Sequence, residues 1–94
     1  MNLGTTLSAY QDNQRLLNLL ASYAVRERVI SAFERIPREI FVPQRLLALS
    51  YEDRALPIGE GQTISQPSLV ASMIDALDLK GDERVLDVGT GSGF

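Results

Sequence analysis

The residues best suited to chemistry lie in a glycine-rich segment near the end of the chain. Gly89–Gly93, with the sequence GTGSG, directly follows Arg84–Val88, a short stretch that is rich in β-branched residues and apolar on both faces of a pleat. That composition predicts a buried parallel strand. Glycines after such a strand allow a sharp turn and let the backbone approach a ligand without a Cβ in the way. In α/β folds that bind nucleotides, the ligand lies at the carboxyl ends of the strands.

The spacing of these glycines distinguishes two classes of cofactor. A dinucleotide-binding fingerprint has two residues between its second and third glycines, whereas only Ser92 separates Gly91 from Gly93. Gly-x-Gly-x-Gly after a strand that ends in an acidic residue is typical of S-adenosylmethionine-dependent methyltransferases. Backbone amides would meet the carboxylate of the cofactor's amino acid head, and Asp87 would favour its ammonium directly or through water. The alternative is a glycine-rich turn without a ligand, beside a merely solvated Asp87.

The composition limits the chemistry that this chain can perform. Its 94 residues contain neither histidine nor cysteine, which excludes the commonest general base, thiolate metal sites and disulfides. A formal net charge of -3 argues against nucleic-acid binding, which needs a basic face. No stretch approaches the roughly 20 apolar residues of a membrane span, and the polar start is unlike a signal peptide. We therefore expect a soluble, cytoplasmic protein without a metal site.

Two amphipathic helices are expected in the first part of the chain. Apolar residues recur at three- and four-residue spacing over residues 12–23 and again over residues 25–36. Asp12 or Asn13 is placed to cap the first helix with a side-chain oxygen. Pro37 should end the second helix, because the residue before a proline is pushed out of the helical region.

The middle of the chain is expected to alternate short helical pieces with one irregular stretch. Residues 44–49 predict one or two helical turns, and residues 67–77 predict a helix with a clean apolar stripe. Residues 51–67 have no helical period, and stretches of this length without regular structure are usually functional or disordered. Apolar residues within it argue against disorder. We therefore expect an ordered, functional loop.

Three segments together resemble one enzyme family. They occur in the order and at the separations found in protein-L-isoaspartate (D-aspartate) O-methyltransferases, over about residues 29–94. The most specific part is Gln62–Pro67, with the sequence QTISQP. Phe94 stands where the family commonly has a tyrosine, so it keeps the ring and lacks the hydroxyl. The three matching segments are residues 32–43, 51–67 and 84–93.

The resemblance implies an α/β architecture, the Rossmann-like class I methyltransferase fold. This chain would hold only its first part, namely a helical cap, the first strand and the glycine loop. The expected divisions are an N-terminal helical cap over residues 1–50, a loop that closes over substrate and cofactor over residues 51–67, and the start of the cofactor-binding domain over residues 68–94.

The function implied by the resemblance is protein repair. Such an enzyme transfers a methyl group from S-adenosyl-L-methionine to the α-carboxylate of L-isoaspartyl or D-aspartyl residues in damaged proteins, with S-adenosyl-L-homocysteine as product. The ester closes to a succinimide, and hydrolysis returns some normal aspartate. A carboxylate is already ionised near neutral pH, so it needs no general base. The protein's main task is to align the reacting atoms and exclude water.

The motif match also implies residue roles. Ser65 falls at the family's active-site serine, whose hydroxyl would hold the substrate carboxylate, although a serine just before a helix-opening proline is also a plausible N-cap. Asp53 is expected to be a loop partner rather than a ligand. The implied cofactor-binding positions are Gln62, Thr63, Ile64, Ser65, Asp87, Gly89, Gly91, Ser92 and Gly93.

The sequence is expected to be the N-terminal part of a longer enzyme. Phe94 lies inside the last motif, and the acidic residue expected about 20 positions further on, to hold a ribose, lies beyond it. Alone, the 94 residues should be inactive and poorly soluble. Two alternatives remain open, namely another Rossmann-type S-adenosylmethionine-dependent methyltransferase and a non-catalytic binding relative. The sequence leaves the oligomeric state open.

Overall fold

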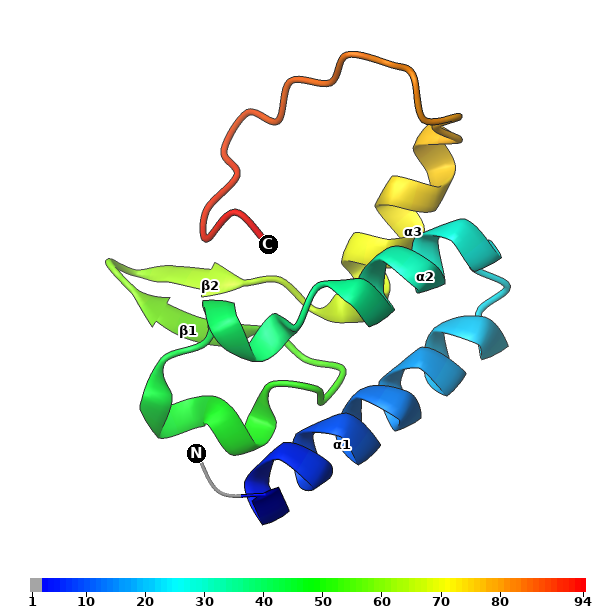
Figure 1. The fold of residues 1–94 in the computed structure, drawn as a ribbon. Helices are drawn as coiled ribbons and strands as arrows, with labels where there is room; N and C mark the ends of the chain where they lie inside the picture. Colours follow the sequence, from blue (N-terminus) through cyan, green and yellow to red (C-terminus); the bar gives the residue numbers. More distant parts are fainter. Residues whose placement is uncertain (1–2) are drawn as a thin grey trace.

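A computed structural model describes residues 3–94 of the chain, and side chains from Leu7 onward. These residues form three α-helices, two short 3-10 helices and a two-stranded antiparallel sheet (Figure 1). Their order is α1 (Leu3–Ser22), α2 (Glu27–Arg35), η1 (Arg38–Phe41), η2 (Gln44–Leu49), β1 (Leu56–Gly59), β2 (Gln62–Ile64) and α3 (Pro67–Leu77). The combination of helices with a small sheet agrees with the α/β class, without forming a Rossmann-like sheet.

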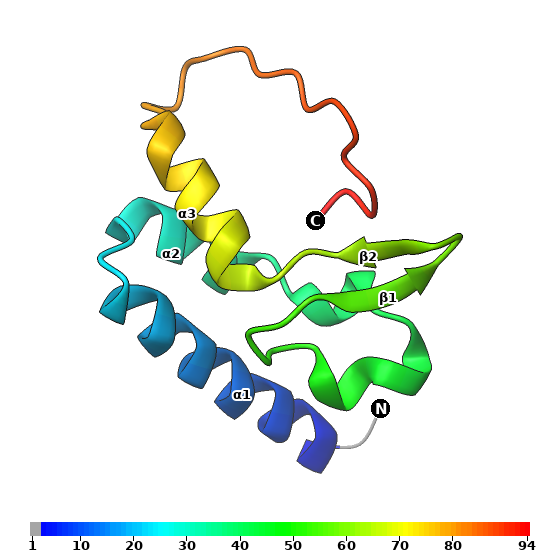
Figure 2. The same ribbon diagram turned by 180° about the vertical axis from the view of Figure 1, so that it is seen from behind.

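The larger core lies where α2 packs against both α1 and α3. Both views of the ribbon place α2 between the other two helices (Figures 1 and 2). The apolar stripe predicted over residues 12–23 faces this core. Burying an aliphatic or phenylalanine side chain contributes roughly 1.5–3 kcal/mol. The buried residues of the core are Leu16, Leu17, Leu20, Val25, Val29, Ile30, Phe33 and Ala71.

The predicted start of the first helix is wrong. α1 begins at Leu3, so that Asp12 and Asn13 lie inside the helix and cap nothing. Asp12 instead accepts a hydrogen bond from the Arg15 guanidinium at 2.9 Å, one turn further along. Leu3, Leu7 and Tyr10 stand at helical spacing before Asp12, but they are separated by polar residues and the prediction did not use them. Leu7 and Tyr10 are 52% and 62% exposed, so these first turns lie outside the core.

The second helix and the short helical turns agree with the sequence. α2 ends at Arg35, and Ile36 before Pro37 is extended, with a φ of -112°, as the proline requires. Glu27 in the first turn and Arg35 in the last complement the helix dipole. The turns predicted over residues 44–49 are present as η2.

The stretch predicted to lack regular structure contains a β-hairpin, which corrects that expectation. β1 and β2 pair antiparallel, with Leu56 opposite Ile64 and a bulge after Pro57. Leu56 and Ile64 are 0% and 3% exposed and pack with Val42 in a second, smaller core. Strands of four and three residues are too short for an alternating pattern to stand out. The hairpin gives the segment before α3 a regular structure with one buried side.

The buried strand predicted over residues 84–88 does not form. The backbone has no regular structure there, and Val85, Leu86 and Val88 are 60%, 86% and 85% exposed. A parallel strand is stable only between neighbouring strands, and the described residues contain none that pairs with it. The prediction is wrong for this chain because the apolar residues have nothing to pack against.

Candidate active site

The loop between β2 and α3 presents Ser65 to solvent. Ile64 before it is buried in the smaller core, and Pro67 after it opens α3, so both sides of the loop are anchored. The N-cap residue of α3 is Gln66, whose side chain makes no capping hydrogen bond. The alternative in which Ser65 serves as the N-cap is therefore wrong. Its hydroxyl is exposed and available to another partner.

Asp53 performs the capping instead, which confirms it as a loop partner. One carboxylate oxygen accepts the Ser68 backbone N–H at 2.8 Å, and the other accepts the Gln66 side-chain amide at 3.1 Å. Burial raises the pKa of the Asp53 carboxyl, but these hydrogen bonds and the Arg38 charge outweigh it and hold the pKa below its usual value. The ionised carboxylate therefore joins the start of the hairpin region to the start of α3.

Asp53→Ala is expected to lower the free energy of unfolding by about 1–2 kcal/mol, the usual cost of a lost helix cap. Asp53→Asn keeps acceptor oxygens and should lose less. Because the folded-state pKa is depressed, the contribution of the charge is fully present above pH 3.8 and is lost as the pH falls below it. Urea unfolding between pH 7 and 3 measures this. A wild type and an Asp53→Asn variant with parallel pH profiles would contradict it.

The glycine segment has the backbone conformation that its sequence requires. Gly89, Gly91 and Gly93 have φ angles of 78°, 62° and 90°, in the region that side chains disfavour. A Cβ placed on any of them would meet no atom within 4 Å. These positions therefore require glycine because of the backbone conformation. No neighbouring atom of the protein would clash with a side chain there.

Arg38 and Phe94 bring the glycine segment to the loop that carries Ser65. The Arg38 side chain is 1% exposed, and its Nη1 donates to the Ser65 carbonyl at 3.0 Å. Its guanidinium carbon lies 5.4 Å from the centre of the Phe94 ring, which also packs edge-on against Phe33 and Phe41. The chain leaves α3, arches away and returns beside β2 (Figures 1 and 2). Two motifs far apart in sequence thus meet at Arg38.

The other residues predicted to bind the cofactor differ in their exposure to solvent. Gln62 and Thr63 on β2 are exposed, as is Asp87. Ile64 is buried against Leu56, so it has only its backbone to offer a ligand. Ser92 accepts a hydrogen bond from the Phe94 N–H at 3.3 Å, which shapes the glycine turn. The contacts of the described residues include no hydrogen bond between the Ser65 loop and the glycine segment themselves.

Arg38 is the one site residue that sequence reasoning missed. Its signal was a charged residue between Pro37 and the apolar run at residues 40–42, inside a segment that matches the family. An arginine at that position is expected to be exposed to solvent, because arginine is seldom fully buried. Only the fold reveals that it lies beneath the site.

Comparisons with known proteins identify the family of this chain. A family model described as protein-L-isoaspartate(D-aspartate) O-methyltransferase matches residues 11–94. The chain belongs to this family. Relatives named protein-L-isoaspartate O-methyltransferase include one from Dictyoglomus thermophilum, 52% identical over 86% of this chain, and one from Rhodopseudomonas palustris, numbered 1 and 48% identical over 95% of it. Another, numbered 2, from Marinobacter nauticus, is 64% identical over 71% of the chain.

The chain spans a minor part of the length of these relatives. It covers 37% of the Dictyoglomus and Rhodopseudomonas proteins and 31% of the Marinobacter protein. Within residues 3–94, none of the helices is long and apolar enough to cross a bilayer. The same residues hold no cluster of acidic side chains suited to a metal ion.

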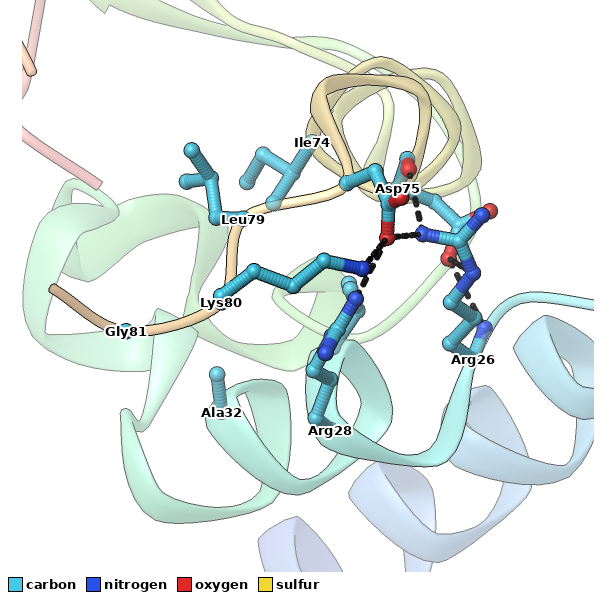
Figure 3. A pocket seen from close by; sticks show the side chains of 10 residues that line it. Arg26, Arg28, Ala32, Ile74, Asp75, Leu79, Lys80 and Gly81 are labelled. Carbon is cyan, nitrogen blue, oxygen red and sulfur yellow. Dashed lines mark hydrogen bonds and ion pairs between the residues drawn. The ribbon is translucent and has the colours of Figure 1, made fainter. Parts of the chain in front are cut away.

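A separate hollow of about 330 Å³ lies between α2 and α3 (Figure 3). Arg26, Arg28 and Lys80 converge there on Asp78, with Arg28 at 2.6 Å and Lys80 at 3.0 Å. The hydrogen bond from Lys80 and the nearby cations hold the pKa of Asp78 below its usual value. Asp75 accepts the Arg26 backbone N–H at 3.0 Å. These ion pairs join the start of α2 to the end of α3, away from Ser65.

Proposed function

We propose that the full-length protein transfers a methyl group from S-adenosyl-L-methionine to the α-carboxylate of L-isoaspartyl and D-aspartyl residues in damaged proteins. Family membership supports this reaction. The observation that carries the proposal is the docking of the glycine segment beside the Ser65 loop, through the contacts of Arg38 with the Ser65 carbonyl and the Phe94 ring. Those contacts bring a motif suited to the cofactor and a motif suited to the substrate to one side of the hairpin.

The residues of the glycine segment fit the proposed cofactor. Three glycines at positive φ, with open space where each Cβ would stand, allow a ligand to approach the backbone amides. Gly89, Gly91, Ser92 and Gly93 would hold the carboxylate end of the ligand, and Asp87 would hold its ammonium. When bound, S-adenosyl-L-methionine supplies an electrophilic methyl group on a sulfonium.

The role proposed for Ser65 is to orient the substrate carboxylate. Its hydroxyl is exposed on a loop anchored by the hairpin and by the Asp53 cap. A hydrogen bond to one carboxylate oxygen would leave the other free to attack, and it would fix the direction of approach. Gln62 and Thr63, and Ile64 through its backbone, would close the site against water. No residue of this chain needs to remove a proton.

The Rossmann-like architecture and the three divisions of the chain form part of the same proposal. The apolar residues at 85, 86 and 88 support it, because their exposure here leaves a segment suited to pairing with parallel strands. A cytoplasmic location stays a prediction from the sequence.

The test compares two peptides that differ only at one residue, isoaspartyl in one and aspartyl in the other. With methyl-labelled S-adenosyl-L-methionine, the full-length protein should label the isoaspartyl peptide and leave its aspartyl twin unlabelled. Equal labelling would indicate a different methyltransferase. Absence of both labelling and cofactor binding would favour a non-catalytic relative.

A further inference from the structure

Arg38 is a buried cation without an anionic contact. No ion pair among the described residues includes it, and its Nε makes no hydrogen bond although it is fully buried. Burial lowers the pKa of Arg38 to about 10, with a smaller opposing effect from the Asp53 charge. The group therefore stays charged near neutral pH. Burying a charge with incomplete partners costs free energy, so stability alone is a poor explanation for an arginine here.

The contacts of Arg38 connect three segments of the proposed site. Nη1 donates to the Ser65 carbonyl at 3.0 Å and Nη2 to the Arg54 carbonyl at 3.2 Å. The carbon of the same guanidinium lies over the ring of Phe94, the residue that follows the last glycine, at 5.4 Å from the ring centre. The guanidinium is a rigid planar fork that holds its two donors at fixed directions while it lies over a ring, whereas a lysine ammonium is a point charge on a flexible stem.

The bond to the Ser65 carbonyl bears on catalysis through geometry. It fixes the peptide plane that follows Ser65 and, with it, the direction in which the Ser65 side chain leaves the backbone. The contact of the guanidinium with the ring, together with Phe33 and Phe41, holds Phe94, and hence Gly93, beside that loop. A displacement of about 1 Å between reacting groups can cost about 100-fold in rate.

We infer that Arg38 is the positioning residue of this site, which holds the Ser65 loop and the glycine segment at the separation that methyl transfer requires. The inference rests on the proposed function. It assigns Arg38 no contact with the substrate or with the cofactor. Its effect passes through the Ser65 carbonyl on one side and the Phe94 ring on the other.

The experiment uses Arg38→Lys and Arg38→Met in the full-length protein, with Arg45→Met as the matched control. Arg45 is exposed on η2, so its loss removes the same charge away from the site. At saturating cofactor and peptide, kcat should fall roughly 10- to 100-fold in both Arg38 variants. The KM for the isoaspartyl peptide should change much less, and Arg45→Met should match the wild type. Turnover of Arg38→Lys within twofold of the wild type would overturn the inference.

A spectroscopic readout separates positioning from plain stability. In Arg38→Lys, backbone amide resonances of Gln66 and of Phe94 should shift together, while those of α1 stay in place. A change at only one of the two segments would overturn the link. Activity losses that merely follow the fraction of unfolded protein would also overturn it.

Phe94→Leu keeps the test decisive if both Arg38 variants fail to fold. It removes the ring from the guanidinium and leaves the two carbonyl hydrogen bonds in place. Affinity for S-adenosyl-L-homocysteine should then fall at least about fivefold, with the peptide KM unchanged, and unchanged affinity would overturn the inference. Failure of the wild type to methylate the isoaspartyl peptide would contradict the proposed function alone. The paired amide shifts would still test whether Arg38 connects the Ser65 loop to the glycine segment.

Discussion

Ser65→Ala is expected to lower kcat/KM for an isoaspartyl peptide roughly 10- to 150-fold. The reason is the loss of one hydrogen bond to a charged carboxylate, worth about 1.5–3 kcal/mol. The free energy of unfolding should change by less than about 0.5 kcal/mol, because the Ser65 side chain is exposed and caps no helix. Steady-state kinetics and urea unfolding of the same preparation measure both quantities.

The matched control for this variant is Ser72→Ala. Ser72 lies on the exposed side of α3, within two turns of Ser65 in the chain, and the same atom is removed. Its kinetics should equal those of the wild type. Near-normal turnover by Ser65→Ala would remove the hydroxyl from the site, and a fall of equal size in both variants would show that the effect is not specific to Ser65.

Gly91→Ala is expected to weaken binding of S-adenosyl-L-homocysteine at least about tenfold. At a φ of 62° an alanine costs roughly 1–2 kcal/mol of backbone strain, and its methyl group enters the space that the ligand would occupy. The strain lowers stability, because the free loop already has this φ, whereas the clash of the methyl group with the ligand lowers affinity. A clash that costs about 1.4 kcal/mol corresponds to a tenfold change in the dissociation constant. Isothermal titration calorimetry with the full-length protein measures the dissociation constant.

Gly81→Ala controls for backbone strain alone. Gly81 also has a positive φ, 115°, and open space beside it, but it lies in the turn after α3 rather than in the glycine segment. Its substitution should leave the dissociation constant within about twofold of the wild type. If Gly91→Ala binds as tightly as the wild type, the glycine segment does not hold the cofactor.

Prolines and apolar stripes predicted the helices, because a helix is stabilised by its own hydrogen bonds and by the burial of one face. α3 begins at Pro67 and ends at Leu77 as expected, because a first-turn proline and an apolar stripe mark it clearly. α2 ends before Pro37 for a similarly local reason. Elements that depend on distant partners were predicted less well. The hairpin depends on Leu56 meeting Ile64, and residues 84–88 depend on strands that are absent from the described chain.

The candidate site was predicted in its residues but not in its assembly. The glycine spacing and the QTISQP segment marked two separate motifs, and the positive φ angles of Gly89, Gly91 and Gly93 agree with the first. Their meeting through Arg38 and Phe94 is a tertiary feature. A charged residue beside the apolar run at residues 40–42 was the one sequence signal for Arg38, and neither periodicity nor composition indicates that its side chain is buried against backbone carbonyls.

A crystal structure of the full-length protein with S-adenosyl-L-homocysteine tests the central claim most directly. It should place the ligand's carboxylate on the amides of the glycine segment. Its sulfur should face the Ser65 hydroxyl across a gap wide enough for one carboxylate. A ligand bound elsewhere, or a Ser65 hydroxyl that points away from the sulfur, would contradict the account.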